Sequence, residues 1–280
     1  MLQAEFPGLT LERAAYGFDI GGRPPDECGP GGIVFAPLDD WLVANSGTGE
    51  LFRLRGTGGK AREVLNKDCG VSDLAVGPDG QLFGSQKTEI VELDPATGAV
   101  LRSVAGGFLE LVGLVFDALS GRLIVADFEA TAIYEVDHAT GERSVRAAGS
   151  LLGNPNGIVV DDAGRILVAG YGNKHVLAVE LDGTVLDLGF LPGGPDGIAL
   201  GGPDGPFPGS AIVNQRDGSV VQLAKSGRLT TLANGGTPGD LIAVDAHGYL
   251  FVTQFDEIIR IGPSWFAPQP WRLLRSPLPR

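Results

Sequence analysis

Residues 154–183 read NPNGIVVDDAGRILVAGYGNKHVLAVELDG, and this stretch decides the fold. It contains three short apolar runs rich in β-branched residues: Ile158–Val160, Arg165–Ala169 and Val176–Val179. Runs of this length, separated by glycine turns, are typical of antiparallel strands that follow one another in a meander. Gly164 and Gly183 stand at the turns, where glycine accepts a positive φ without a Cβ clash.

The same module recurs along the whole chain. The residue just before each first apolar run forms a column: Gly32, Asp73, Gly113, Gly157, Gly197 and Asp240. The steps along this column are 41, 40, 44, 40 and 43 residues. A repeat of this length with about four strands per unit is typical of β-propeller blades. The sequence therefore predicts an all-β fold: a six-bladed β-propeller with four-stranded antiparallel blades.

The sixth repeat provides only three strands near the C-terminal end, at 241–244, 249–253 and 258–261. The N-terminal segment contains Leu9–Leu11 and Ala14–Tyr16, which together have the pattern of one more strand. We expect this strand to complete blade six and close the ring, because closure removes a free sheet edge. The alternative is an unpaired N-terminal extension.

Three regions follow from this pattern: residues 1–28 close blade six, residues 29–261 form the propeller, and residues 262–280 form a tail. The tail is rich in proline, lacks acidic residues, and carries Trp265, Phe266 and Trp271 together with three arginines. We expect it to lie across the body and bury its aromatic rings, since exposed aromatic side chains are unfavourable. The alternative is a docking tail for a protein partner. A nine-residue proline-rich insertion in blade five, Gly201–Gly209, is expected to decorate the surface.

Charge and hydropathy exclude several classes of partner. The 280-residue chain has a net charge of −13, whereas nucleic acids and anionic membranes need a basic surface. No segment reaches the ~18 consecutive apolar residues that span a bilayer, and the first residues lack the pattern of a signal peptide. We therefore expect a soluble protein with a small-molecule ligand. The sequence leaves the compartment open, export included.

Cys28 and Cys69 occupy equivalent positions in blades one and two, five residues before Ile33 and Leu74. Equivalent loop positions in neighbouring blades can lie close enough to form a disulfide, which requires Cα atoms within about 7 Å. Two separate thiols are the slightly favoured interpretation. A disulfide would instead indicate an oxidising compartment.

Polar residues are expected to gather where the six innermost strands begin, because these strand starts surround one mouth of the central channel. The residues before the column are Gly31, Ser72, Val112, Asn156, Asp196 and Gly239, and the column itself adds Asp73 and Asp240. Loops between second and third strands add Asn45, Asp127, Tyr171 and Asn214. Polar groups that converge on a concave mouth are the default hypothesis for a ligand site. The predicted ligand-binding residues are Asn45, Ser72, Asp73, Asp127, Tyr171, Asn214 and Asp240.

Pro-Asn-Gly-Ile at 155–158 and Pro-Asp-Gly-Ile at 195–198 resemble units of the senescence-marker-protein, gluconolactonase and regucalcin family of six-bladed propellers. More loosely, the repeat is similar to NHL-repeat and virginiamycin B lyase-like propellers. In the lactonase family a divalent cation is held by a Glu of blade one, Asn residues of blades three and four, and an Asp of blade five. By this resemblance Asn156 and Asp196 are metal ligands, and Asp196 is the catalytic residue.

The chain also departs from that family. Residues 28–32 read Cys-Gly-Pro-Gly-Gly where blade one should supply Glu, and Val112 stands where blade three should supply Asn. One divalent cation, which would be calcium, zinc or manganese, is implied by the resemblance, and the loss of the family ligands at Gly31 and Val112 argues for its absence. The catalytic His and Glu set of the lyases has no counterpart here.

Two functions remain open. The first is a metal-dependent hydrolase of the gluconolactonase type, which acts on a lactone or a related small ester at the channel mouth. The second is a non-enzymatic propeller that binds a small molecule or a protein at the same face.

Overall fold

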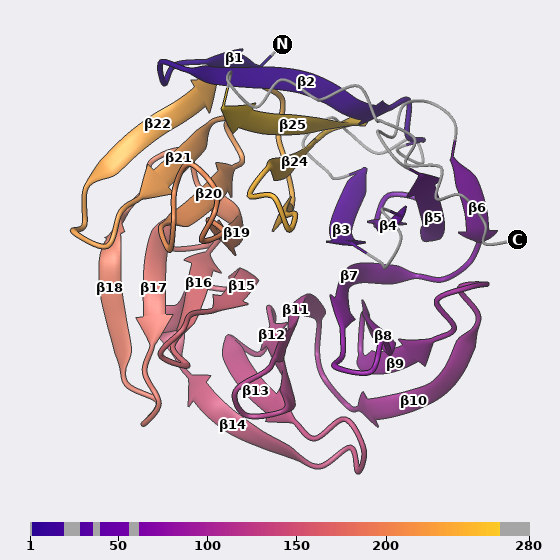
Figure 1. Cartoon of the computed structure of the whole chain (residues 1–280). Coiled ribbons are helices and arrows are strands. Elements are labelled where there is room, and N and C mark those ends of the chain that lie inside the picture. Colours follow the sequence, from indigo (N-terminus) through magenta and orange to yellow (C-terminus); the bar gives the residue numbers. More distant parts are fainter. Residues whose placement is uncertain (1, 20–28, 36–39, 56–61, 264–280) are drawn as a thin grey trace, which may run out of the picture.

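The computed structural model describes residues 2–19, 29–35, 40–55 and 62–263. Six antiparallel sheets surround one axis, with β3, β7, β11, β15 and β19 nearest the centre of the ring (Figure 1). The six-bladed propeller predicted from the repeat is confirmed. Cys28 and the tail aromatics Trp265, Phe266 and Trp271 lie outside the described residues, so the disulfide and the course of the tail stay predictions. Cys69 itself is buried and forms no disulfide with any described residue.

The strands of each blade are given from the axis outward. Blade one contains β3 (Pro30–Phe35), β4 (Asp40–Asn45), β5 (Glu50–Arg55) and β6 (Glu63–Asn66). Blade two contains β7 (Val71–Val76), β8 (Leu82–Gln86), β9 (Glu89–Leu93) and β10 (Val100–Gly106). Blade three contains β11 (Leu111–Asp117), β12 (Arg122–Asp127), β13 (Ala132–Val136) and β14 (Arg143–Ala148).

The remaining blades follow the same order. Blade four contains β15 (Pro155–Val160), β16 (Ile166–Gly170), β17 (His175–Val179) and β18 (Val185–Phe190). Blade five contains β19 (Pro195–Leu200), β20 (Ala211–Gln215), β21 (Val220–Leu223), β22 (Leu229–Asn234) and the short β1 (Gln3–Ala4). Blade six contains β23 (Ile242–Val244), β24 (Leu250–Gln254), β25 (Glu257–Pro263) and β2 (Leu9–Tyr16). The one short 3-10 helix among the described residues is Ser150–Leu152.

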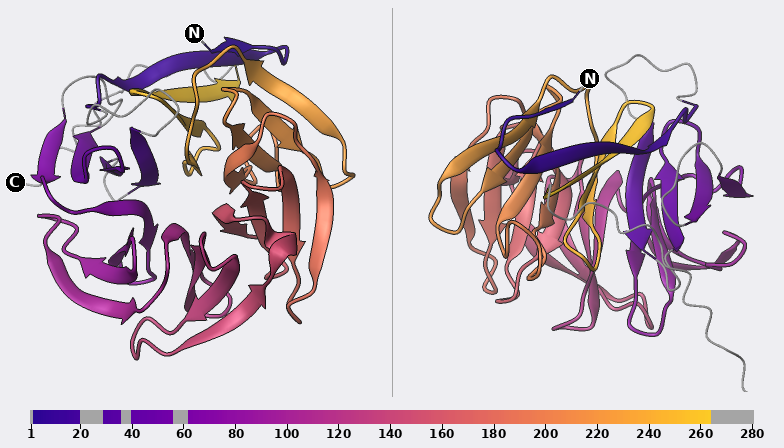
Figure 2. Two further views of the ribbon diagram at one scale, coloured as in Figure 1. Left: turned by 180° about the vertical axis from the view of Figure 1, so that it is seen from behind. Right: turned by 45° about the horizontal axis from the view of Figure 1, so that its top comes forward.

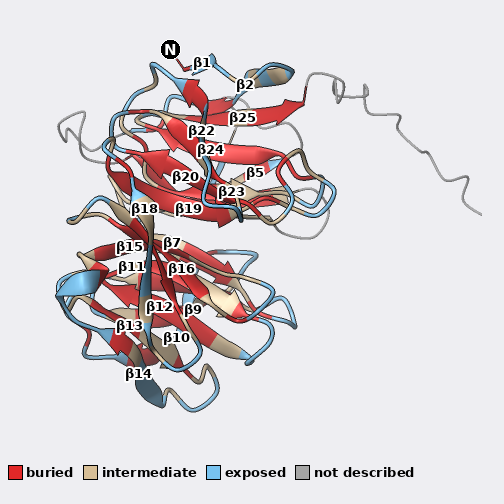
Figure 3. Cartoon of the chain, turned by 90° about the vertical axis from the view of Figure 1, so that its left-hand side faces the viewer, coloured by how far each residue is buried: buried red, intermediate tan, exposed pale blue. Residues whose placement is uncertain are grey.

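The hydrophobic core is divided among the interfaces between neighbouring blades. One cluster joins blades three and four through Ile124, Leu152 and Val168, and the other interfaces have clusters of the same kind. Burial is highest along the strands, and the exposed residues lie mainly on loops and outer strands (Figure 3). The described part of the chain has no helix long and apolar enough to cross a membrane.

The N-terminal strand closes the ring, as the sequence predicts. β2 pairs with β25 from Leu9 opposite Pro263 to Tyr16 opposite Glu257, and the two strands run side by side in Figure 2. Ala15 on this strand is fully buried, so the pairing also contributes to the interface between blades six and one. The pairing of β1 with β22 adds a fifth strand to blade five. A two-residue strand has no detectable periodicity, which is why the sequence pattern does not reveal it.

The column of glycines marks where inner strands of neighbouring blades touch. A Cβ atom on Gly113 would lie 2.3 Å from the carbonyl oxygen of Asn156, and one on Gly197 would lie 2.4 Å from that of Asp240. One on Gly157 would lie 2.7 Å from the carbonyl oxygen of Asp196. Real Cβ atoms do not approach backbone this closely, so only glycine lets the strands pack at these distances.

We expect deletion of residues 1–19 to cause aggregation or loss of cooperative unfolding, because β25 would become an unpaired edge. Thermal unfolding monitored together with light scattering measures this. As a control, Arg13→Ala removes a surface ion pair and a cation–π contact with Tyr16 from a side chain that is 49% exposed, and it should shift stability by about 1 kcal/mol or less. A truncated protein that melts like the full chain would contradict the closure.

We expect Gly157→Ala to lower the free energy of unfolding by about 1 to 3 kcal/mol, because the new methyl group overlaps the backbone of blade five. Urea denaturation measures the loss. Gly106→Ala is the matched control, since its Cβ would meet nothing nearer than 3.7 Å. Equal stability of the two variants would show that the column glycines do not set the spacing of the blades.

Candidate functional site

A β-bulge brings the residue before the column toward the channel. In blade four Pro155 pairs with Gly170 and Ile158 pairs with Val168, so Asn156 and Gly157 together face one partner residue. In blade five Asp196 is the extra residue between the pairs formed by Pro195 and Gly197. The inner strands of blades one to three have the same irregularity. Bulges redirect a side chain and are frequent beside functional sites.

Asn156 and Asp196 meet at this position. The Asn156 amide nitrogen donates a hydrogen bond to Oδ1 of Asp196, and both side chains are buried, at 7% and 4% exposure. The remaining oxygen of Asn156, Oδ1, is buried and accepts no hydrogen bond from the described residues. A buried polar atom without a partner is costly, so this oxygen points to something that the protein alone does not provide.

The carboxyl groups of the channel are electrostatically coupled. Burial raises the pKa of Asp196 well above its ordinary value, and the negative charge of Asp240 adds to this, against the effects of Arg216 and the Asn156 hydrogen bond. Burial also raises the pKa of Asp73 to about 7, although hydrogen bonds from the backbone N–H groups of Leu114 and Leu74 oppose it. Asp240 again contributes to the rise. The charge of Asp240 in blade six therefore raises the pKa of carboxyl groups in blades two and five.

The fit to a divalent cation can be tested on these groups. The free Asn156 oxygen and the Asp196 carboxylate are adjacent oxygen donors of the kind that hard cations prefer. Asp240 lies near Gly31, because its Oδ2 is 3.1 Å from the place of a Cβ on that glycine. Within the described ranges, however, no three acidic, histidine or cysteine side chains are close enough to share a metal ion. The described residues thus supply two adjacent oxygen donors to a cation at this position.

Three predicted ligand-binding residues form hydrogen bonds to the protein backbone with their polar atoms. Asn45 donates to the backbone oxygen of Asp19, and Asn214 donates to that of Thr253. Asp127 accepts hydrogen bonds from the backbone N–H groups of Leu109 and Glu110 at 2.9 and 3.0 Å. All three side chains are at most 1% exposed. The structure does not bring them to the surface of the mouth.

Ser72 and Tyr171 are more accessible. Ser72 is half-buried, and its backbone oxygen lies 2.8 Å from the place of a Cβ on Gly31. Tyr171 stands between Phe128 and Arg216, two side chains that are not among the predicted ligand-binding residues. Its ring meets the edge of Phe128 at 5.4 Å between centroids, and the Arg216 guanidinium lies over it at 4.3 Å. Blades three, four and five thus contribute one side chain each to this stack.

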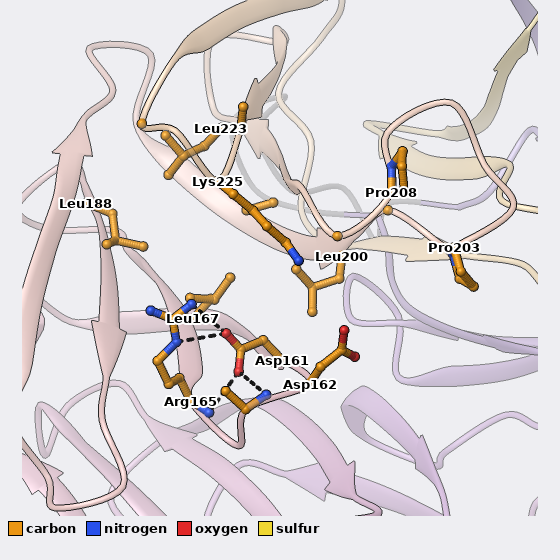
Figure 4. Close-up of a pocket in the computed structure, with 16 residues that line it drawn as sticks. Asp161, Asp162, Arg165, Leu167, Leu188, Leu200, Pro203, Pro208, Leu223 and Lys225 are labelled. Atoms are coloured by element: carbon orange, nitrogen blue, oxygen red, sulfur yellow. Dashed lines mark hydrogen bonds and ion pairs between the residues drawn. The ribbon is translucent and has the colours of Figure 1, made fainter.

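A separate cavity of about 550 Å³ lies at the far ends of the same inner strands (Figure 4). Its floor contains Leu167, Leu188, Leu200 and Leu223, and Pro203 and Pro208 of the blade-five insertion form one wall. Phe207 anchors this insertion in the core against Phe6, at 5.7 Å between ring centroids. The insertion therefore helps to form a concave surface on the face opposite Asp196.

Comparison of sequences identifies no relative. No protein-family model matches the chain. No curated protein matches it either.

Solved structures do resemble the fold. A gluconolactonase from Xanthomonas campestris superposes with a TM-score of 0.71 at 15% identity, covering 84% of this chain and 86% of the other. A calcium-binding protein, regucalcin, from Agrobacterium tumefaciens gives 0.66 at 16% identity, with 89% and 94% covered. Virginiamycin B lyase from Staphylococcus aureus gives 0.61 at 13% identity, with 91% and 99% covered. These likenesses show a shared propeller fold, as the resemblance noted in the sequence implies.

We expect the free energy of unfolding to fall as the pH rises from about 4 to about 7, because the folded-state pKa of Asp73 exceeds its ordinary value of 3.8. The folded protein then binds more protons than the unfolded chain. The stabilisation that comes from Asp73 is therefore fully present below its ordinary pKa of 3.8, and it is lost as the pH rises through the folded-state pKa of about 7. One such group contributes at most about 1.4 kcal/mol per pH unit.

Urea denaturation across this pH range, on wild type and Asp73→Asn, measures the slope. The variant should show a shallower decline, whatever its absolute stability, since Asn carries no titrating proton. Parallel curves for the two proteins would contradict the assignment.

Proposed function

We propose that this protein is a hydrolase of the gluconolactonase type, which opens a lactone or a related small ester at the channel mouth with one divalent cation. The observation that carries the proposal is the Asn156–Asp196 pair, with a buried carboxyl group beside an amide oxygen that has no partner among the described residues. The fold shared with a gluconolactonase and with a calcium-binding regucalcin supports it.

The chemistry follows from the environment of Asp196. Asp196 is a buried carboxyl group fixed by one hydrogen bond, and a carboxylate held in this way can take a proton from water and return it. Asp196 accepts a proton from the water that attacks the carbonyl carbon, and it then donates that proton to the leaving oxygen when the ring C–O bond breaks. The product is a hydroxy acid, and Asp196 returns to its starting state.

Asn156 holds this carboxylate in place. Its amide nitrogen donates to Oδ1 of Asp196, which leaves the other carboxylate oxygen to face the reacting water. Asn156 Oδ1 and Asp196 would hold the cation, which when bound polarises the carbonyl or lowers the pKa of water. The nearby charge of Asp240 favours a cation in this region.

A non-enzymatic propeller that binds a small molecule at the same face is the second candidate. It is favoured by the small number of ligands, since no set of three metal-binding acidic, histidine or cysteine side chains occurs in the part of the chain that the structure describes. This candidate predicts binding at the mouth without turnover.

We expect Asp196→Asn to lower kcat for lactone hydrolysis roughly 10²- to 10⁴-fold, the usual contribution of a general acid–base group. It should also weaken binding of calcium, zinc or manganese in a calorimetric titration, because one negative charge is lost. Its stability at neutral pH should not fall, since Asn still accepts the hydrogen bond from Asn156 and removes repulsion with Asp240.

Asp162→Asn is the matched control, because Asp162 is an exposed carboxylate that lines the cavity on the opposite face. It should leave both hydrolysis and metal binding unchanged. Wild-type protein that binds none of the three cations and hydrolyses no member of a panel of γ- and δ-lactones would refute the hydrolase proposal. Binding of a small molecule under those conditions would support the second candidate.

A further inference from the structure

The loop that leads to Asp196 lies between two basic side chains. Lys174 from blade four and Arg216 from blade five line one cavity of about 440 Å³ together with Pro192, Gly193, Gly194 and Asp217. Gly194 comes two residues before Asp196, so this cavity adjoins the proposed catalytic carboxylate. It lies on the same face of the propeller as Asp196, because its lining comes from the β16–β17, β18–β19 and β20–β21 loops, whereas the cavity of Figure 4 lies at the other end of these strands.

Arg216 is held in place from two sides, and its charge also acts on the carboxyl group of Asp196. Its backbone N–H donates to the oxygen of Gly194, and its Cδ atom lies 3.6 Å from the place of a Cβ on that glycine. Its guanidinium lies over the ring of Tyr171, which itself rests against Phe128. No described carboxylate lies within 4.0 Å of its side-chain nitrogens. Stacking fixes the plane of the guanidinium and leaves its N–H donors at the edge for a ligand.

Lys174 faces the same space. Its backbone is anchored on both sides, since its N–H donates to Gly170 and its carbonyl accepts from Leu191. Its ammonium group donates to the carbonyl oxygen of Pro192 at 3.3 Å, which is a neutral partner. Asp217, the one acidic residue of the lining, already accepts from the N–H and the hydroxyl of Ser219.

The charge of this cavity is opposite to that of the protein. Two basic side chains and one carboxylate give the lining a net charge of +1, while the whole chain carries −13. An isolated basic cavity in an acidic protein attracts an anion only at short range, because the surrounding charge repels it at a distance. Two cationic side chains that line one small cavity suit a single anionic group, and they are too few to bind a nucleic-acid backbone.

We propose that Lys174 and Arg216 bind a carboxylate or phosphate group of the ligand, so that the molecule taken at the mouth is a small acidic compound. Placing the reactive part of that compound at Asp196, and hence naming an acidic lactone or ester as substrate, rests on the proposed function. The anion site itself does not. Arg216 supplies the planar pair of donors that carboxylate and phosphate accept, and Lys174 supplies a second charge.

Calorimetric titration with D-glucose, D-glucuronate and D-glucose 6-phosphate tests the site, since these share one sugar ring and differ in the group on carbon six. The titrations are made in low salt with a chelator present, so they need neither turnover nor a metal. We expect at least one of the two anions to bind tenfold or more tightly than glucose. The anion that binds more tightly identifies the bound group, which is a carboxylate for D-glucuronate and a phosphate for D-glucose 6-phosphate.

Arg216→Gln should reduce the affinity for that anion about tenfold and leave the affinity for glucose unchanged, and Lys174→Gln should have a smaller effect in the same direction. Lys225→Gln is the matched control, because Lys225 lines the opposite cavity. Anions that bind no better than glucose would overturn the site, and so would an equal loss in Lys225→Gln. Asp196→Asn should retain anion binding, so loss of hydrolysis with intact anion binding separates the two proposals.

Discussion

The close contact of neighbouring inner strands at the glycine column is the constraint on which this molecule depends. Each contact brings the backbone of one blade against that of the next, at distances that admit no Cβ atom. A bulge at the same level places an extra residue beside the contact. The packing that holds the blades together therefore also presents Asn156 and Asp196 side by side.

Asp73, one of the two aspartates in the column, has surroundings that differ from those of Asp196. Asp73 accepts from two backbone N–H groups, one of which belongs to Leu114 of the next blade, so its carboxylate connects blades two and three. Asp196 has one side-chain donor, Asn156, with the charge of Arg216 in its favour and that of Asp240 against it. No backbone N–H group of the described residues is recorded as donating to it, so it does not connect two blades in the way that Asp73 does. Strongly perturbed groups in a cleft are more often functional.

The sequence predicted the fold further than it predicted the site. Periodicity identifies blades, and the missing fourth strand of the last repeat leads to the N-terminal partner, because both depend on patterns that extend over many residues. The role of a single polar residue does not depend on such a pattern, so periodicity cannot reveal it. Asn45, Asp127 and Asn214 have the residue types of a ligand site, yet their polar atoms hold loops together in the core. The position of Arg216 over Tyr171 depends on contacts between two blades, which no local pattern contains.

The closure by β2 and β25 has a consequence for how the chain is made. The Thr10 hydroxyl donates to the backbone oxygen of Gly262, 252 positions later, so β2 is made long before the strand that it pairs with. At synthesis rates of about 5 to 20 residues per second, this separation corresponds to a delay on the order of ten to fifty seconds. The strands of blades one to four are therefore synthesised before the partner of β2 exists. Until the last repeat has been synthesised, β2 has no partner strand and the ring cannot close.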